Sequence, residues 1–399
     1  MRTLFFIFGL ILLFAIEILR VYFIMPFPGS QRSDTIGIAY FLNNNILWLR
    51  ILALAMVVPA LLYFFRNGRT GRKIVLTGLI LVYGLIFYFF NFRFLADKMF
   101  YQPRTKLFAG SATDTTDRDK LVIGVDLQGE ARAYPVEVIG YHHQVKDTIA
   151  GQPVMVTYCT VCRTGRVYSP FIQGHYARFR LVGMDHFNAM FEDEGTKSWW
   201  QQATGKAITG PLKGVQLAEI PSAQMRLGEW LALHPNSLTL QPDTVFKARY
   251  ADLKGYDEGV IDGSLERRDS GSWKFKSWVI GVNLHGESKA YDWNRLVKNR
   301  IIQDTIGRQH LLLTLEPNNK TFYVWSVADA AHFQFDPSTH LLKDETTQST
   351  WRADGVCIDG PMKGQKLAPV QAYQEFWHSW RTFHPGTGGY PSTHSGMEL

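Results

Sequence analysis

Two cysteines separated by two residues are the feature of this sequence best suited to chemistry. Cys159-Thr160-Val161-Cys162 follows a segment typical of a strand, and Arg163-Thr164-Gly165 leads into another. A strand, a tight turn that carries Cys-x-x-Cys, a glycine and a returning strand are typical of a metal knuckle, in which both sulfurs face one ion. In thioredoxin-like sites the cysteines instead begin a helix, whose positive end lowers the pKa of the thiol. The sequence predicts no helix after Cys162.

A knuckle with two cysteines needs further ligands, because zinc takes four. His142, Met190 and His186 are the candidates that the sequence offers. Two thiolates with imidazole and a thioether form a soft ligand set suited to Cu(I), or to Zn when the thioether is left out. We therefore predict a site for copper or zinc made of Cys159, Cys162, His142, Met190 and His186. The sequence identifies no catalytic residue and no site for an organic cofactor.

An internal repeat singles out two of these candidates. Val122–Glu130 recurs as Val279–Glu287, and further matches follow in the same order downstream. A repeat of this length is rarely accidental. In the alignment of the two copies, Cys159, Cys162, His142 and Met190 stand opposite Glu316, Asn319, Asn299 and Leu341. His142 and Met190 are thus lost where the cysteines are lost, which is expected of a ligand set that works only as a whole.

The same cysteines are compatible with two other functions. In a metal-free thiol-disulfide protein, Cys159 would be the attacking thiolate and Cys162 the resolving partner. In a non-enzymatic binding scaffold, the pair would only brace a turn, as a structural disulfide does in an oxidising compartment. The third cysteine, Cys357, has no neighbouring cysteine in the sequence and is predicted to be a buried apolar residue.

Short β-type runs and glycine turns surround the cysteines. The predicted strands are Leu121–Leu127, Ala131–Tyr134, Pro153–Tyr158, Arg166–Tyr168 and Ala177–Val182. Ser222 is the expected N-cap of a helix that reaches about His234, and the second copy has a counterpart from about Gln371 to His384. The segment Gln241–Trp273 is interpreted as the connection between the copies, and the tail Pro385–Leu399 has little to pack against.

Three apolar runs precede this β-rich region. They are Leu4–Met25, Ile46–Phe65 and Ile74–Phe92, each about the 20 residues needed to cross a bilayer as a helix. The first run is too long for a cleaved signal peptide, and no small-residue cleavage site follows it. The loop Arg66–Lys73 carries four positive charges and no acid. This loop is therefore expected in the cytoplasm, which places everything after Phe92 outside.

Charged residues also occur within the apolar runs. A charge at the bilayer centre costs roughly 2.5 to 3.5 kcal/mol on insertion scales, so Glu17 is expected to pair with Arg50 from the neighbouring helix and lock the two together. The net charge of +7 resides largely in the flanks of the apolar runs, where lipid-facing roles account for it. No nucleic-acid motif is present, so membrane lipid and a protein partner of unknown identity are the expected partners.

The predicted fold is an N-terminal three-helix transmembrane region followed by a β-rich α+β soluble part made of two duplicated lobes. Residues 1–99 form the membrane region, residues 100–245 the first lobe with the Cys-x-x-Cys site, and residues 246–399 a second, degenerate copy with the tail. We expect a multi-pass protein of the plasma (inner) membrane whose soluble part is extracytoplasmic.

Several segments around the cysteines resemble a known bacterial family. They are His142, Asp147–Val154, Thr157–Cys162, Trp200-x-Gln202 and Gly205-x-Ala207-Ile208-x-Gly210. Together they resemble the family catalogued as domain of unknown function 3179, well over Leu121–Leu240 and weakly over the second copy. In that family a proline usually follows the first cysteine and an acid follows the histidine, whereas this chain has Thr160 and His143. The resemblance supports the cysteine site and implies no reaction.

Overall fold

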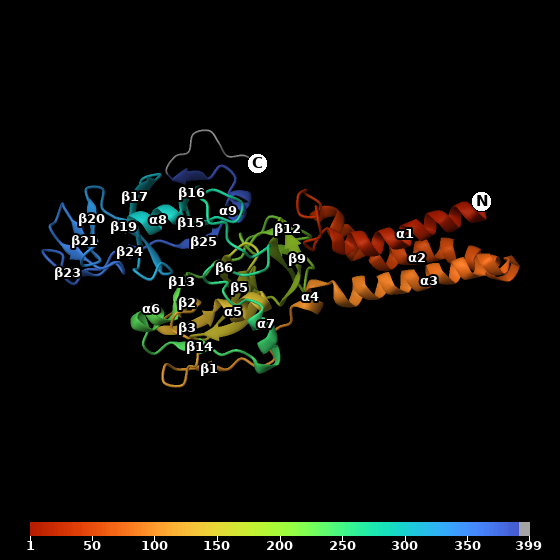
Figure 1. Cartoon of the computed structure of the whole chain (residues 1–399), viewed down its shortest axis with the longest axis horizontal. Coiled ribbons are helices and arrows are strands. Elements are labelled where there is room, and N and C mark those ends of the chain that lie inside the picture. Colours follow the sequence, from red (N-terminus) through yellow and green to blue (C-terminus); the bar gives the residue numbers. More distant parts are fainter. Residues whose placement is uncertain (391–399) are drawn as a thin grey trace. The chain divides into compact units, whose positions relative to one another are not determined.

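The computed structural model describes residues 1–390, which form two compact units (Figure 1). Unit 1 consists of Met1–Tyr101, Ile172–Gln201 and Gly205–Gln216. Unit 2 consists of Gln102–Phe171, Gln202–Thr204 and the chain from Leu217 onward. Residues 391–399, the end of the predicted tail, lie outside the described residues. The domain boundaries predicted after residues 99 and 245 stay predictions.

Unit 1 begins with a run of helices. They are α1 (Arg2–Tyr22), α2 (Ile36–Asn67), α3 (Thr70–Tyr88), the π-helical turn η1 (Phe89–Arg93) and α4 (Ala96–Met99). Arg2–Tyr22, Ile36–Asn67 and Thr70–Arg93 are long and apolar enough to cross a membrane. The three predicted apolar helices are thereby confirmed, although α2 begins at Ile36 rather than at Ile46.

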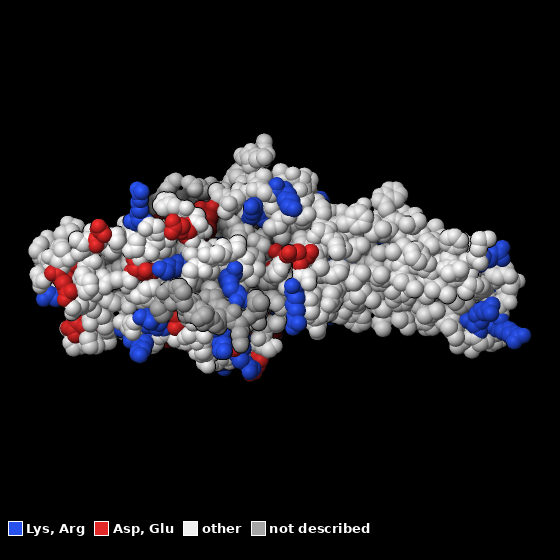
Figure 2. Space-filling model, turned by 90° about the horizontal axis from the view of Figure 1, so that it is seen from above, with Lys and Arg blue, Asp and Glu red and all other residues white. Residues whose placement is uncertain are grey.

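The long helices of unit 1 pack closely and also leave apolar side chains exposed. A Cβ atom added at Gly9 would lie 2.8 Å from Cβ of Met56, so the absence of a side chain lets α1 approach α2. Large apolar side chains such as Phe8, Trp48 and Leu81 are exposed. Figure 2 shows blue Lys and Arg side chains at the far end of these helices and a white surface along their length. Such a surface is typical of helices that face lipid.

A buried polar cluster joins the three helices. The Arg50 guanidinium donates to Glu17 through Nε at 2.6 Å and through Nη2 at 2.7 Å. Asn91, which η1 carries, donates from Nδ2 to Oε2 of Glu17 at 2.9 Å. Arg20 donates to Oδ1 of Asn91 at 2.7 Å. The predicted pairing of Glu17 with Arg50 is therefore confirmed.

Unit 1 also contains a four-stranded antiparallel sheet in the order β12-β11-β10-β9. Its strands are β9 (Phe179–Asp185), β10 (Asn188–Asp193), β11 (Trp199–Gln201) and β12 (Ala207–Thr209). Two further short strands, β7 (Phe171–Ile172) and β8 (His175–Tyr176), pair with each other.

The N-terminal half of unit 2 is built on two sheets. The first has the order β1-β14-β3-β2-β13 and the second the order β4-β5-β6. Their strands are β1 (Phe108–Ala109), β2 (Leu121–Leu127), β3 (Glu130–Pro135), β4 (Gln144–Ile149), β5 (Gln152–Cys159), β6 (Thr164–Tyr168), β13 (Ala223–Arg226) and β14 (Leu238–Leu240). The helices are α5 (Val136–His142), α6 (Leu227–Leu233), the 3-10 turn η2 (Thr244–Phe246) and α7 (Lys247–Ala251).

The C-terminal half of unit 2 has three sheets, with the orders β25-β15-β16-β26, β17-β18-β19-β24 and β20-β21-β22-β23. The strands are β15 (Trp278–Leu284), β16 (Glu287–Asp292), β17 (Ile301–Ile306), β18 (Gln309–Leu315), β19 (Phe322–Val327), β20 (Phe333–Asp336), β21 (Leu341–Asp344), β22 (Thr350–Trp351), β23 (Cys357–Asp359), β24 (Ala368–Pro369), β25 (Ala372–Phe376) and β26 (Gly388–Tyr390). The helices are α8 (Trp293–Asn299) and α9 (Trp377–Phe383).

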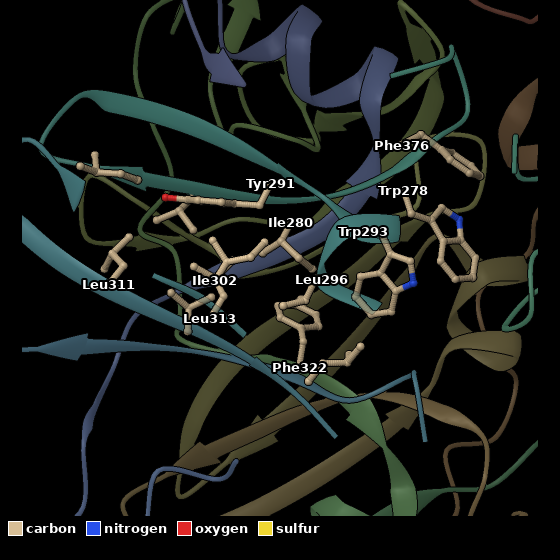
Figure 3. Packing of buried hydrophobic residues seen from close by; sticks show 14 residues of the cluster. Trp278, Ile280, Tyr291, Trp293, Leu296, Ile302, Leu311, Leu313, Phe322 and Phe376 are labelled. Carbon is tan, nitrogen blue, oxygen red and sulfur yellow. The ribbon is translucent and has the colours of Figure 1, made fainter. Parts of the chain in front are cut away.

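The core of this half lies between its sheets and α8. Figure 3 shows Trp278, Ile280 and Tyr291 packed with side chains from α8 and from neighbouring strands, and all of them are buried. Burial of these aromatic and branched side chains is the dominant favourable term for such a core. Trp278 also places its ring 3.9 Å from the guanidinium carbon of Arg163, so this core reaches the cysteine turn.

The sequence predicts one helix near the end of each copy, and both observed helices begin later than predicted. The residues after Ser222 form strand β13, which pairs antiparallel with β2, and helix α6 starts only at Leu227. Strand β25 likewise precedes α9, and it pairs antiparallel with β15. Sheet pairing with distant strands overrides the local helix signal here. The predicted tail also packs at its start, because β26 pairs with β16.

Candidate functional site

The cysteines lie in a hairpin turn, as the sequence predicts. Cys159 ends β5 and pairs with Thr164, the first residue of β6, so four residues form the turn. Arg163 completes the turn in the left-handed region, at φ 55°. Cys159 and Cys162 are both fully buried, and no disulfide joins any of the cysteines of the described chain. The context of strand, turn and strand is therefore confirmed.

Cys159 and Cys162 flank Thr160 and Val161 in the hairpin, and the two thiols influence each other electrostatically. Cys159 and Ser379 both act on the pKa of the Cys162 thiol. Burial raises the pKa of Cys162 well above its ordinary value, and Cys159 raises it further, whereas Lys276 and Ser379 lower it. Since burial dominates, the Cys162 thiol is protonated at neutral pH.

A lysine from the C-terminal half covers the turn between the cysteines. Lys276 is 6% exposed, and its ammonium donates to the carbonyl oxygen of Val161 at 2.5 Å. Burial lowers the pKa of Lys276, while the nearby thiols of Cys162 and Cys159 raise it. The site thus combines two soft sulfur atoms with a cationic group.

Helix α9 and the residue before it complete the cover. The backbone N–H of Phe376 donates to the carbonyl of Cys162 at 3.0 Å. Nε2 of His378 lies 3.1 Å from the Lys276 ammonium and 3.2 Å from the Val161 carbonyl. Burial lowers the pKa of His378 well below its ordinary value, which keeps the imidazole neutral at physiological pH.

Sequence reasoning missed Lys276, His378 and Ser379 as parts of the site. It used the repeat to find residues that occur only in the first copy. A search for residues that occur only in the second copy is the signal that could have pointed to residues such as these. The partners of Val161 lie 115 and 217 residues away along the chain, so local patterns could not reveal them.

The predicted connection between the copies also contributes to the site. The hydroxyl of Tyr256 donates to the Thr160 carbonyl at 2.9 Å. The guanidinium of Arg163 donates to the carbonyls of Tyr256 and Asp257, at 3.2 and 3.4 Å. This segment therefore also holds the cysteine turn in place.

The structure places His142 at the end of α5, where it is fully buried. Nε2 of its imidazole lies 2.7 Å from the hydroxyl of Tyr250 in α7. The ring also packs edge-on against Phe246, with 5.2 Å between the ring centroids. One ring nitrogen is thus engaged by a tyrosine.

Met190 and His186 belong to unit 1, whereas the cysteines and His142 belong to unit 2. Met190 is buried in β10. Nδ1 of His186 lies 2.7 Å from the Asp185 carboxylate and Nε2 lies 3.5 Å from Asp34, and the hydrogen bond to Asp185 raises the pKa of His186. Within residues 1–390, no group of three or more His, Cys, Asp or Glu side chains is arranged to hold a metal ion. The five-residue ligand set stays a prediction.

These features define a class of protein: a β-rich region with a buried dithiol, preceded by three helices that are long and apolar enough to cross a membrane. Residues 102–387 match the family model described as protein of unknown function (DUF3179), and the chain belongs to this family. The match covers both halves of unit 2 and extends beyond the stretch that carries the resemblance most clearly. Comparisons with curated proteins and with solved structures found no match.

Proposed function

We propose that this protein handles copper outside the cytoplasm, with Cys159 and Cys162 binding one Cu(I) ion. The observation that carries the proposal is that two fully buried thiols lie on either side of Val161 and Thr160, with the Lys276 ammonium bonded to the Val161 carbonyl. Thiolates are soft ligands that favour Cu(I), Zn and iron–sulfur clusters over hard cations. His142, Met190 and His186 remain predicted additional ligands, and each can be tested by substitution.

Charge favours Cu(I) over Zn at this site. Two thiolates and one Cu(I) carry a net charge of −1, and the Lys276 ammonium would offset it. Burying an uncompensated charge is costly, so this balance supports the monovalent ion. Zn also takes four ligands, and the two thiols supply only half of them.

The three long helices support a membrane anchor. We propose that they cross the plasma (inner) membrane and that unit 2 lies outside the cytoplasm, because the loop Arg66–Lys73 is strongly basic and remains inside under the positive-inside rule. A reporter enzyme that is active only outside the cytoplasm, fused after Tyr390, should be active. An inactive reporter there and an active one in the loop would reverse the orientation.

We further propose that the two halves of unit 2 are duplicated lobes. The pairing order β13-β2-β3-β14 in one half and β25-β15-β16-β26 in the other supports this. In both halves the last strand pairs in parallel and the other two contacts are antiparallel. Duplication would explain how one copy keeps the cysteines while the other supplies the residues that cover them.

A metal-free thiol-disulfide protein is the second candidate, and the position of both cysteines in one hairpin favours it. In that case both thiols would lose their protons and two electrons to the disulfide of a partner, which would leave as two thiols. The full burial of both cysteines requires the turn to open before such an exchange.

Copper binding to the purified full chain separates the two candidates. The reduced wild-type protein should bind one Cu(I) per chain, and Cys159→Ser and Cys162→Ser should each abolish it. Cys357→Ser is the matched control, because Cys357 is buried in the same unit and its thiol donates to the Asp359 carbonyl at 3.3 Å. A wild-type chain that binds no Cu(I) but forms a Cys159–Cys162 disulfide would support the second candidate.

A further inference from the structure

A cleft of about 490 Å³ lies within unit 2, between its two halves. One wall is formed by β2, β13 and α6, and the other by β19, β24 and β25. Ser222 and Gln371 exchange two hydrogen bonds, at 3.1 and 2.9 Å, and thereby tie the two walls together. The volume lies within the range of roughly 300–1,000 Å³ that is typical of pockets for small molecules.

Two pairs of stacked rings shape this cleft. The ring of His234 stacks on Trp230 with 4.0 Å between the ring centroids. The ring of Tyr323 stacks on Trp325 at 5.3 Å. Trp230 lies directly over Gly124, where a Cβ atom would be 2.3 Å from the indole. Both tryptophans are buried, whereas His234 and Tyr323 are partly exposed, so the cleft offers two rings that the tryptophans hold in place.

The C-terminal half of unit 2 contains the same arrangement with its space filled. Trp380 lies over Gly281 and stacks on His384 with 3.7 Å between the ring centroids. Tyr373 pairs with Gly281, and the guanidinium carbon of Arg166 lies 3.3 Å from the centroid of the Tyr373 ring. Arg166 is buried. An aromatic ring and a guanidinium therefore occupy this position in the C-terminal half.

Two exchanges of residues leave the cleft open in the N-terminal half. Ala223 stands in the place of Tyr373, because each pairs with the glycine under the tryptophan. Tyr323 stands in the place of Arg166, because the two have the same position in the strand that follows the hairpin turn. The ring of Tyr323 thus lines the space that the small side chain of Ala223 leaves free. Guanidinium groups bind to the faces of such rings.

The charge of the cleft also favours a cation. Asp126 is the one carboxylate among the described residues that line the cleft, and none of these residues is a lysine or an arginine. Oδ2 of Asp126 lies 3.1 Å from Nδ1 of His234. Burial and the charge of Lys366 lower the pKa of His234, so its imidazole is neutral at physiological pH and leaves the carboxylate uncompensated.

We propose that this cleft binds a small guanidinium compound. The cation stacks on Tyr323 as Arg166 stacks on Tyr373, and it pairs with the carboxylate of Asp126. Arg166 itself donates to Glu375 at 2.5 Å, so the C-terminal half already shows a guanidinium held by a ring and a carboxylate. The two cysteines of the hairpin turn are not among the described residues that line the cleft. The inference is therefore independent of copper binding.

Calorimetric titration of the full chain in detergent micelles tests this site. The probe is N-acetyl-L-arginine amide, and the matched control is N-acetyl-L-citrulline amide, which has nearly the same shape without the charge. The arginine probe should bind at least about tenfold more tightly than the citrulline control, because hydrogen bonds between charged groups are the stronger ones. Equal affinities, or no binding of the arginine probe at millimolar concentration, would overturn the proposal.

Variants that exchange residues between the two halves locate the site. Ala223→Tyr introduces the side chain of the other half and should abolish binding by filling the cleft. Asp126→Asn should weaken binding by at least about tenfold. Asp329→Asn is its control, because Asp329 pairs with His310 at 2.7 Å elsewhere in unit 2, and it should leave the affinity unchanged. Wild-type affinity in Asp126→Asn would overturn the assignment, even if Ala223→Tyr does not fold.

Discussion

Two hairpins of unit 2 differ in how they are covered. The turn between β5 and β6 is buried at all four of its residues, Thr160 to Arg163. In the turn between β18 and β19, Glu316 donates its N–H to the Thr321 carbonyl at 2.9 Å, while Pro317 and Asn319 are exposed. A hairpin of this kind is thus stable with its turn near solvent. Burial of the first turn is an additional feature that its partners impose.

The partners of the two turns differ in kind. Lys276, Phe376 and His378 close over the cysteine turn through its backbone carbonyls. The second turn instead makes side-chain contacts, from Asn318 to Glu229 at 2.9 Å and from Lys320 to Glu258 at 2.8 Å. Contacts of the second kind add little stability and leave water nearby. The comparison teaches that the cysteine turn is buried by residues distant in the sequence, whereas the second turn stays near solvent.

Breaking the buried ion pair between Arg166 and Glu375 should have the largest effect on stability. Arg166→Met leaves Glu375 buried without its cation and should destabilise the protein by about 3–5 kcal/mol. Arg352→Met is the control in the C-terminal half, because Arg352 is 51% exposed and pairs with Asp354 there. It should cost about 0–1 kcal/mol. Thermal unfolding of the full chain measures both, and equal losses would contradict the contrast.

Removing the cation over the cysteines should weaken copper binding. Lys276→Met leaves the negative charge of a Cu(I)-dithiolate uncompensated, so the affinity should fall by at least about tenfold. Lys320→Met removes an ammonium from the other turn and should leave the affinity unchanged. Competition with a chelator of known affinity measures both. An unchanged affinity in Lys276→Met would show that the ammonium does not balance the site.

Copper affinity should also depend on pH through Cys162. Burial raises the pKa of this thiol, so at neutral pH Cu(I) must displace its proton. Below that pKa the affinity should rise about tenfold per pH unit for this proton. A pH series of the same competition experiment gives the slope. A flat profile between pH 6 and 8 would mean that Cys162 is already ionised or is not a ligand.

Ionisation of Glu316 in the turn between β18 and β19 should make the stability of the protein depend modestly on pH. Burial, with Asp354 and Glu229 nearby, raises the pKa of Glu316 from 4.5 to about 7. A carboxyl whose folded pKa is raised favours folding below about pH 4.5, and this contribution is lost as the pH rises through about 7. Glu316→Gln should therefore gain on the order of 1 kcal/mol relative to wild type between pH 5 and 8. An identical pH dependence in both proteins would contradict this.

Much of the local structure follows from sequence patterns. The apolar runs predict the three long helices, and the cost of an unpaired charge among them predicts the contact of Glu17 with Arg50. Strand β2 has the predicted bounds, Leu121–Leu127. The turn signals around Cys159 and Cys162 likewise predict the hairpin that carries them.

The features that these local patterns miss depend on contacts between residues far apart in the sequence. Strands β13 and β25 are interpreted as helix from their local sequence, and only pairing with β2 and β15 makes them strands. The cover of the cysteine turn depends on Lys276, which is 115 residues from Val161. Residues at such separations become neighbours through the sheet topology, which local periodicity does not encode.

The most direct test of the copper proposal is X-ray absorption at the copper edge on the reduced full chain loaded with Cu(I). The proposal predicts one copper per chain with two sulfur neighbours, and loss of the metal in Cys159→Ser. Copper surrounded only by nitrogen or oxygen, or no copper retained by the reduced wild-type chain, would contradict it.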